Sequence, residues 1–476
     1  MKRSPQRKAV LRRPTSASAR LQDRLRKRRR HLFLERLEDR SLLASLIWSG
    51  AGADNRWSTA GNWVGGAVPQ QDDDLIFPAG ALNTTNVNDL TGMRFRTITV
   101  SSSSYNISGN AITLLEGLTY NGVGTGASFS VPLALGGNAT FYSANAGSRI
   151  ALGNIDLGNQ QTLTTDGLGD IDVSGVISGT GGSGITKLGD GTLILGGSNT
   201  FDGLVQASQG VIRVTNSSGL GATTGGTVVG TGAAIHVSGN INVPENIVVN
   251  NVGVGFEIDT LGAIRSVGGA NTLSGAISLA TNSAFGVDAG STLTVSGTIA
   301  AVPNTTDTGF TKYGAGTLVL SGTTDNPITG QVTVLGGTLE LGKTGGAQPF
   351  YGALVIGDNR NVGSPGSPQA QVRLTSPNQL PELNFLRTGV NTITINSNGL
   401  LNLNNQSDVI GSLVMFTGRS VSAQLTTGTG QVILTGDITV NAAADSSAAA
   451  PPARISGTQQ TRWVFHQRSS SRGRQS

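Results

Sequence analysis

The stretch that decides the fold is residues 184–214, which read GITKLGDGTLILGGSNTFDGLVQASQGVIRV. A second version, GFTKYGAGTLVLSGTTDNPITGQVTVLGGTLEL, occupies residues 309–341. In both copies a Thr-Lys pair leads into Gly-x-Gly-Thr-Leu-x-Leu, then a polar corner and a second apolar alternation. Matching positions are 125 residues apart before the corner and 127 apart after it. An insertion confined to a turn, with both strands kept, is typical of stacked-coil architectures.

The hydrophobic period within each copy is two. Residues 192–195 (TLIL) form a short run of strand formers, and Gly-Gly-Ser-Asn follows as a tight corner. No window between Leu46 and Val440 shows helical spacing of comparable strength. Strands this short cannot bury a core as one hairpin, whereas stacked coils seal a continuous interior. The pattern therefore predicts an all-β parallel β-helix over residues 47–441.

Composition supports this architecture and excludes some chemistry. The chain has 476 residues with 69 Gly, 13% charged residues and no Cys. Gly, Asn and Ser turn corners through positive φ angles or side-chain-to-backbone bonds, so they suit a fold with many turns. The absence of Cys excludes disulfides, thiolate metal sites and cysteine nucleophiles.

The formal net charge of +5 is unevenly distributed. Residues 1–40 hold 15 Lys/Arg and 4 Asp/Glu, residues 446–476 hold 5 Arg and no acid, and residues 41–445 hold 13 basic and 24 acidic residues. The acidic body has no basic stripe with interleaved aromatics, so we expect no nucleic-acid partner. Nucleic-acid binding by residues 1–31 is kept only as a third hypothesis.

Residues 1–46 are expected to be a basic leader that directs export. A cationic run ends at His31, and LFL and then LEDRSLLA follow it, which is the order of a signal peptide. Residues 37–43 resemble the Leu-Glu-Pro-Arg-x-Leu-Leu sorting segment at the start of large bacterial cell-surface and secreted repeat proteins, with Asp39 in place of Pro. The resemblance implies an extracellular or cell-surface location. The apolar patch, residues 42–47, is too short for a transmembrane span.

The two ends of the predicted β-helix have distinct compositions. Residues 47–78 hold Trp48, Trp57 and Trp63. We favour a cap that covers the first coil over an aromatic platform for carbohydrate. Residues 442–476 are an Ala/Ser/Pro linker and a basic tail, which we expect to be disordered.

The two copies resemble the autotransporter-associated β-strand repeat, whose pattern is close to Lys-x-Gly-x-Gly-Thr-Leu-x-Leu-x-Gly, a spacer and Gly-x-Leu-x-Leu. The Trp-rich segment is also similar to the usual start of proteins that carry this repeat. The resemblance is strong in the two copies and looser over most of residues 47–440. It implies a right-handed β-helix passenger on the cell surface, often adhesive.

One acidic pair could carry chemistry. Asp170 and Asp172 lie two apart in a strand-like segment, so they share one face at ~6–7 Å and could bind a cation or act as acid and base. Polysaccharide-cleaving β-helices would need basic side chains converging on such a pair, and the nearest in sequence are Arg149 and Lys187. We favour two polar residues on a solvent-exposed strand face.

The remaining polar residues predict no site. His31, His236 and His466 are too far apart in the chain to form a cluster, and His236 is expected to face solvent from a strand. Lys187 and Lys312 recur at the same repeat position, which favours a structural role at the coil edge, such as bonding to strand carbonyls. We therefore expect no catalytic, metal-binding or cofactor-binding residues and no cofactor.

Two functions fit these observations. The first is an exported structural or adhesin-like β-helix repeat protein without catalytic activity, whose partners are glycans, the cell envelope or other surface proteins. The second is a carbohydrate-active β-helix enzyme, a polysaccharide lyase or hydrolase, acting through Asp170 and Asp172.

Overall fold

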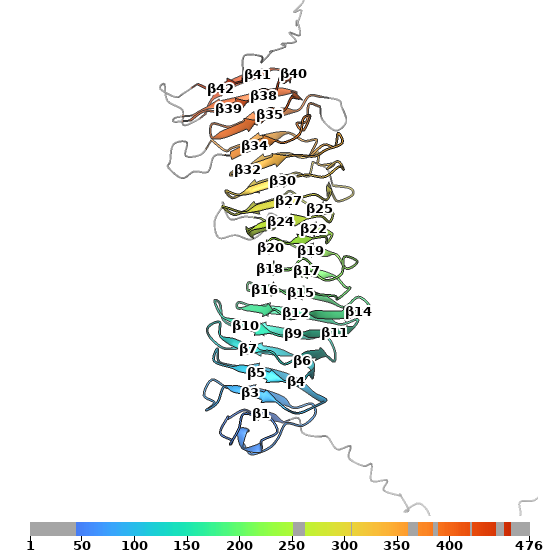
Figure 1. Cartoon of the computed structure of the whole chain (residues 1–476), viewed down its shortest axis with the longest axis vertical. Coiled ribbons are helices and arrows are strands. Elements are labelled where there is room, and N and C mark those ends of the chain that lie inside the picture. The colour runs from blue at the N-terminus through green and yellow to red at the C-terminus, as the bar shows by residue number, and fades with distance from the viewer. Residues whose placement is uncertain are drawn as a thin grey trace, which may run out of the picture. The chain divides into compact units, whose positions relative to one another are not determined.

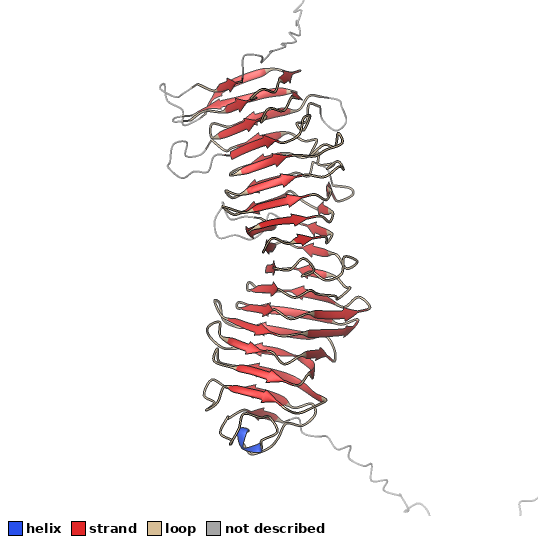
Figure 2. Ribbon diagram, viewed as in Figure 1, coloured by secondary structure: helices blue, strands red, loops and turns tan. Residues whose placement is uncertain are grey.

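The computed structural model describes residues 44–250, 262–305, 307–359, 370–383, 389–418, 421–443 and 452–457. They form one stack of β-coils, from β1 at one end to β40–β42 at the other (Figure 1). Strands make nearly all the regular structure (Figure 2), and the described residues contain no α-helix. The predicted parallel β-solenoid is thus confirmed. The predicted leader, apart from its last three residues, and most of the predicted tail lie outside the described residues.

Three long sheets run along the stack, and strands pair in parallel from one coil to the next. The first sheet contains 15 strands: β1 (Ser45–Ile47), β2 (Asp74–Phe77), β4 (Met93–Val100), β6 (Ile112–Tyr120), β8 (Leu133–Leu135), β9 (Ala139–Ser143), β11 (Ile155–Asn159), β12 (Thr162–Gly167), β14 (Ile177–Thr180), β15 (Gly184–Lys187), β17 (Val205–Ala207), β19 (Thr227–Val229), β22 (Ile247–Val249), β25 (Ile277–Leu279) and β28 (Ile299–Ala301). The second contains 16: β3 (Thr85–Asn88), β5 (Asn106–Gly109), β7 (Ala127–Phe129), β10 (Arg149–Leu152), β13 (Asp170–Val173), β16 (Thr192–Leu195), β18 (Gly210–Val214), β20 (Ala233–Ser238), β23 (Ile264–Gly268), β26 (Ser283–Val287), β29 (Phe310–Tyr313), β31 (Val332–Val334), β33 (Leu354–Ile356), β35 (Thr392–Ile395), β38 (Ser412–Thr417) and β41 (Ile438–Ala442).

The third sheet begins half-way along the stack. It contains nine strands: β21 (Asn242–Val243), β24 (Ala270–Leu273), β27 (Thr292–Val295), β30 (Thr317–Leu320), β32 (Thr338–Leu341), β34 (Ala370–Leu374), β36 (Gly399–Asn402), β39 (Gln424–Thr426) and β42 (Arg454–Ser456). Two further strands, β37 (Asp408–Ile410) and β40 (Val432–Leu434), pair with each other, and η1 (Ala60–Asn62) is a 3-10 turn.

The core is a set of columns of apolar side chains. In β16 the burial alternates, with Leu193 and Leu195 inside, as the period of two predicts. Leu193 lies between Ile171 of the previous coil and Ile212 of the next, and all three are almost fully buried. Fully burying such a side chain contributes roughly 1.5–3 kcal/mol relative to leaving it exposed. The coils are therefore held together by one continuous interior.

The two repeat copies use different faces of the stack. The first copy, β15–β18, alternates between the first and second sheets, whereas the second copy, β29–β32, alternates between the second and third. Coil lengths vary: the register neighbours Leu193 and Ile212 are 19 residues apart, whereas Leu339 and Val372 are 33 apart. Because the two copies begin in different sheets, the spacing between them is not a whole number of coils. The same sequence pattern therefore folds on either pair of faces.

Glycine lets successive corners stack closely. A Cβ added at Gly352 would lie 1.8 Å from the carbonyl oxygen of Gly330 in the coil before it, and one at Gly297 would lie 1.9 Å from that of Gly275. Any side chain at these positions would push the coils apart. The abundance of glycine in the sequence therefore has a direct steric reason.

The Trp-rich segment lies in the core. Trp48 and Trp57 are fully buried and Trp63 is 2% exposed, and all three rings pack against Phe77 of β2. Each indole N–H has an acceptor: the Asn83 carbonyl at 2.7 Å, the Asn86 side chain at 2.8 Å and the Trp57 carbonyl at 2.8 Å. No ring face is open to a sugar, so the carbohydrate-platform interpretation is wrong for these residues, and the packing is that of a cap.

The final strand differs from the expected disordered tail. β42 pairs in parallel with β39, and Ile455, opposite Leu425, packs partly buried against the core. Ala453 packs there too, and the Arg454 N–H donates to the Ala423 carbonyl while the Thr427 N–H donates to the Ser456 carbonyl, both at 3.0 Å. β42 is too short to stand out in the sequence.

Candidate functional site

Asp170 and Asp172 lie side by side on β13, as the sequence predicts, and each carboxylate is engaged by a neighbouring coil. Asp170 accepts a hydrogen bond from the backbone N–H of Thr192 at 2.8 Å. Asp172 forms an ion pair with Arg149 at 3.5 Å, because β10 and β13 are paired strands. Burial raises the pKa of Asp172, as does the charge of Asp170, while Arg149 and Arg213 lower it. The contact between Arg149 and Asp172 could not be predicted from the sequence, because it depends on the register between neighbouring coils.

His236 continues this outer face. It is on β20, in register between Arg213 and Arg265 of the adjacent coils. Burial, and then the charge of Arg265, lower the pKa of His236 to about 4. Its Nε2 has no hydrogen-bond partner among the described residues. The side chain thus points outward from the strand, as expected, but two arginines flank it and it is largely covered.

The repeated lysines point into the core. The Lys312 ammonium donates to the carbonyls of Gly314, Gly316 and Gly336 at 2.5, 2.6 and 2.7 Å. Gly314 has a positive φ of 81°, which turns the corner after the lysine. Gly336 belongs to the next coil, so one side chain joins two corners. The motif Lys-x-Gly-x-Gly therefore encodes a ring of backbone carbonyls around a buried ammonium.

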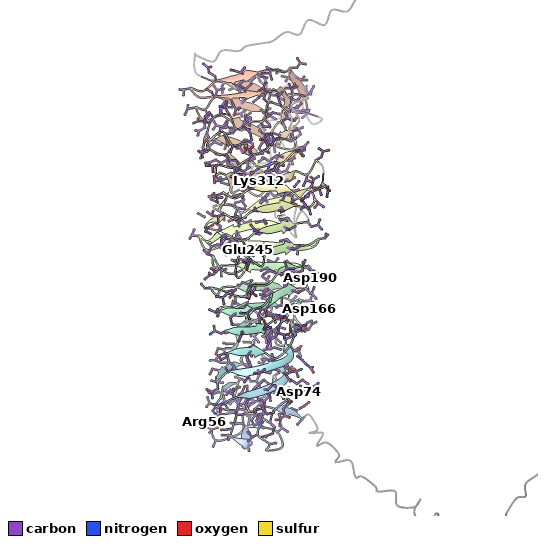
Figure 3. The ribbon with its side chains drawn as sticks, turned by 90° about the vertical axis from the view of Figure 1, so that its right-hand side faces the viewer. Arg56, Asp74, Asp166, Asp190, Glu245 and Lys312 are labelled. Atoms are coloured by element: carbon purple, nitrogen blue, oxygen red, sulfur yellow. The ribbon has the colours of Figure 1, made fainter. Side chains whose placement is uncertain are left out.

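The first copy has a similar arrangement that shares two of the three acceptor positions. Lys187 donates to the carbonyls of Leu188, Gly189 and Gln209, with the last two at 2.7 and 3.4 Å. Burial lowers the pKa of Lys187 to about 8, against the attraction of nearby carboxylates, including Asp166 and Asp190. These two acids lie at adjacent levels of the stack, as Figure 3 shows. The lysines bond to carbonyls, as expected, but the predicted place at the coil edge on strand carbonyls is wrong, because both side chains are buried and their acceptors belong to corners.

A third lysine behaves in the same way. Lys343 is 1% exposed and donates to the carbonyls of Ser321 and Thr324 at 3.0 and 2.7 Å. Lys187, Lys312 and Lys343 are all the lysines in the described part of the chain, and all three are buried. Lysine here is a structural residue.

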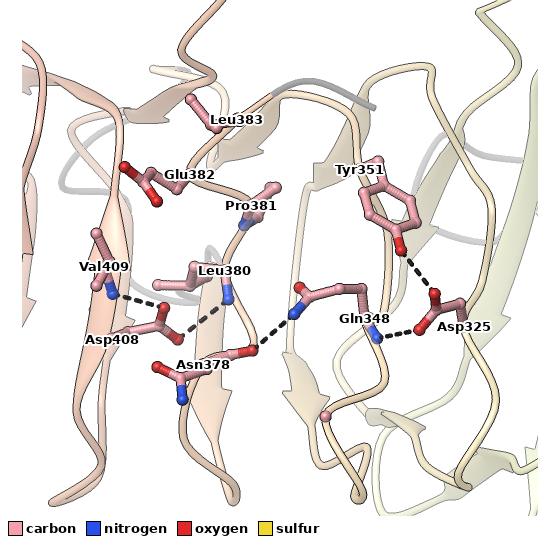
Figure 4. Close-up of a pocket in the computed structure, with 11 residues that line it drawn as sticks. Asp325, Gln348, Tyr351, Asn378, Leu380, Pro381, Glu382, Leu383, Asp408 and Val409 are labelled. Carbon is pink, nitrogen blue, oxygen red and sulfur yellow. Dashed lines mark hydrogen bonds between the residues drawn. The ribbon is translucent and has the colours of Figure 1, made fainter. Parts of the chain in front are cut away.

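A polar pocket is the best candidate for ligand binding. It has a volume of about 470 Å³ and lies where loops follow β30, β32, β34 and β36 on four consecutive coils. Figure 4 shows its two walls, with Asp325 and Tyr351 on one side and Glu382 and Asp408 on the other. Sequence reasoning missed this site, because the loops differ in length and share no motif.

Hydrogen bonds hold the first wall in place. Asp325 accepts from the backbone N–H of Gln348 at 2.8 Å and from the Tyr351 hydroxyl at 2.6 Å. The Gln348 side chain donates to the carbonyl of Asn378 at 3.1 Å. The bond from Tyr351 is the main reason that the pKa of Asp325 lies below its usual value.

Asp408 anchors the second wall. Its carboxylate accepts backbone N–H groups of Gln379 at 2.6 Å, Leu380 at 3.1 Å and Val409 at 2.8 Å. Burial raises the pKa of Asp408 to about 7, although these three bonds favour the charged form. The carboxyl fixes the start of the loop that carries Glu382.

A metal site and a membrane-spanning helix each make specific requirements of the described residues. Within the described ranges, no three His, Asp or Glu side chains lie close enough to hold a metal ion. The helix that the described residues contain is the three-residue η1, which is far too short to cross a membrane.

The comparison with protein families bears on the repeats. The family model of the passenger-associated transport repeat matches residues 185–214 and 310–341, the strands and corners of the two copies. Both repeats are thus similar to this family over nearly their full length. The resemblance to autotransporter-associated repeat proteins is thereby confirmed.

A curated relative extends the similarity beyond the two passenger-associated transport repeats. The chain is 27% identical over 400 residues to the adhesin BmaC autotransporter of Brucella suis biovar 1 (strain 1330). The matched region is 82% of this chain and 9% of that protein, so the chain spans less than a tenth of its relative. No solved structure matches the chain.

Proposed function

We propose that the protein is an exported, adhesin-like passenger protein that acts at the cell surface or outside the cell without catalysis. The observation that carries this function is the placement of two passenger-associated transport repeats within a continuous parallel β-solenoid. The similarity to an autotransporter adhesin over 82% of the chain supports it. Its partners are glycans, the cell envelope or other surface proteins.

The contacts of Asp170 and Asp172 also favour binding over catalysis at this pair. Asp170 is bonded to a backbone N–H and Asp172 is paired with Arg149, so both carboxylates serve contacts between coils. General acid–base catalysis needs a carboxyl positioned to reach a substrate proton. We infer a scaffold that presents loops and strand faces to a partner.

An adhesion assay tests the function. Beads coated with the full chain should bind cells or extracted envelope above the level of beads coated with albumin, and intact producing cells should lose the protein to added protease. Binding at the albumin level, or protection from protease in intact cells, contradicts the proposal. In parallel, a panel of polysaccharides should yield no new reducing ends or unsaturated products. Cleavage that disappears in the Asp170→Asn/Asp172→Asn variant would instead establish the enzyme hypothesis.

A further inference from the structure

The pocket beside Tyr351 has the dimensions of a ligand site. Its lining comes from four consecutive coils, from Asp325 to Asp408, which correspond to three coil steps or ~14 Å along the stack. Its volume of about 470 Å³ is within the range of small-molecule sites. The occupant that fits is therefore longer than one small ring and lies parallel to the axis of the stack.

The pocket is preorganised. Asp325, Tyr351 and Gln348 are tied together by the two bonds to the Asp325 carboxylate, and Gln348 is tied to the next coil through the Asn378 carbonyl (Figure 4). A ring and a carboxylate that are already held in place lose little conformational entropy when a ligand arrives. Bonds between side chains of different coils thus fix the spacing of the contact groups.

The charge of the lining selects the ligand class. Asp325 and Glu382 present carboxyl groups to the pocket, and the lining contains no Lys, Arg or His. Asp408, which is 3% exposed and bonded to three backbone N–H groups, holds the wall in place instead of facing a ligand. An anionic ligand would meet like charge, whereas hydroxyl and ammonium groups would find acceptors. The absence of a metal-binding group among the described residues also disfavours a bare cation.

The remaining lining is suited to a sugar. The half-buried aromatic ring of Tyr351 offers surface to the C–H face of a pyranose, and the buried Leu380 and Pro381 form the floor beneath the pocket. The amides of Gln348 and Asn378 offer donors and acceptors to the sugar hydroxyls. We propose that this pocket binds a neutral or amino-bearing oligosaccharide that lies along four coils. This proposal rests on the proposed adhesin-like function and names the class of ligand that the protein would bind.

Binding to defined sugars tests this site. The full chain is titrated by calorimetry with cellohexaose as a neutral probe, a glucosamine hexamer as an amino-bearing probe and a galacturonate hexamer as an acidic probe. The neutral or amino-bearing hexamer should bind at least about tenfold more tightly than the acidic one, which is about 1.4 kcal/mol. No binding of either favoured probe up to millimolar concentration, or preference for the acidic probe, overturns the proposal.

Variants link the binding to the pocket. Tyr351→Ala should weaken binding about tenfold through loss of the ring face, whereas Tyr142→Ala, at an exposed tyrosine of β9, should leave it unchanged. Circular dichroism verifies folding. If Tyr351→Ala does not fold, Glu382→Gln serves instead, and it should reduce the preference for the amino-bearing over the neutral hexamer at least threefold. A folded Tyr351→Ala protein with parental affinity, or an unchanged preference in Glu382→Gln, overturns the site.

The same variants separate this site from the proposed function. If Tyr351→Ala loses sugar binding but beads coated with the parent protein do not adhere, the result supports the pocket and contradicts the adhesive role. Bead adhesion that persists without any sugar binding supports the adhesive role and overturns the pocket.

Discussion

Replacing Lys312 with methionine tests the physical role of the repeat motif. Methionine has nearly the same length but offers no donor, so the carbonyls of Gly314, Gly316 and Gly336 lose the ammonium that they share. Gly316 keeps a hydrogen bond from the Thr338 N–H at 3.1 Å. Among the described residues, Gly314 and Gly336 have no other donor for their carbonyls.

The magnitude follows from these two orphaned acceptors. Each unsatisfied buried carbonyl costs about 1–3 kcal/mol, and Gly314, which is only partly buried, lies toward the lower end of that range. The variant no longer desolvates an ammonium, which offsets part of this cost. We expect Lys312→Met to lower the free energy of unfolding by about 2–4 kcal/mol at pH 7, which is a large fraction of the stability of a typical domain.

The pH dependence adds a second signature. Burial lowers the pKa of Lys312 from 10.5 to about 7, so between these values the native state binds fewer protons than the unfolded state. The parent should therefore gain stability as pH rises from 7 toward 10, by up to about 1.4 kcal/mol per pH unit. The methionine variant lacks this slope, and the difference between the two proteins should be larger at pH 9 than at pH 7.

Hydrogen exchange in β29–β32 is the suitable assay, because solenoid coils contact mainly their neighbours and can open locally. Urea unfolding followed by circular dichroism gives the global value. Lys187→Met should act in the same direction in β15–β18, and Thr311→Met, on the outer face of β29, is the matched control. Equal protection of β29–β32 in parent and Lys312→Met at both pH values would show that the carbonyls do not depend on the ammonium.

Three further perturbations have defined outcomes. Glu245 is 2% exposed, and burial raises its pKa to about 7, so the native state loses stability as pH rises from 4.5 through 7 and the carboxyl becomes charged. Glu245→Gln should therefore be more stable than the parent by about 1–2 kcal/mol at pH 8, seen as a higher melting temperature. At pH 4.5 the two proteins should melt at the same temperature. Gly352→Ala should destabilise the protein by more than about 2 kcal/mol in urea unfolding because its Cβ meets the Gly330 carbonyl, whereas Gly80→Ala, with open space around it, should be neutral. Trp57→Ala should cost about 3–5 kcal/mol and remove much of the near-ultraviolet dichroism, and a variant with parental stability would contradict the packing of the cap.

The sequence was sufficient for the architecture because its signals are local. The period of two around Leu193 and the glycine corners predict stacked coils, and the recurrence of Lys187 and Lys312 predicts a structural bond to carbonyls. The direction of these lysines into the core could not be predicted, because it depends on carbonyls of the next coil.

The pocket between Asp325 and Asp408 could not be predicted from local sequence patterns. Asp325 and Asp408 lie 83 residues apart in sequence, and only the lengths of the intervening coils bring them to one pocket. The contact between Arg149 and Asp172 likewise arises from the pairing of β10 with β13. Contacts between coils require the register, which no single stretch of the sequence contains.

The use of different faces by the two repeats has an evolutionary consequence. A repeat pattern that is found on either pair of faces does not require a fixed phase with the residues around it. Recombination could then duplicate, delete or transplant such a segment at many positions of the gene while the neighbouring strands keep their partners. Proteins built this way can change length freely, and their surface loops can diverge without endangering the axis that carries them.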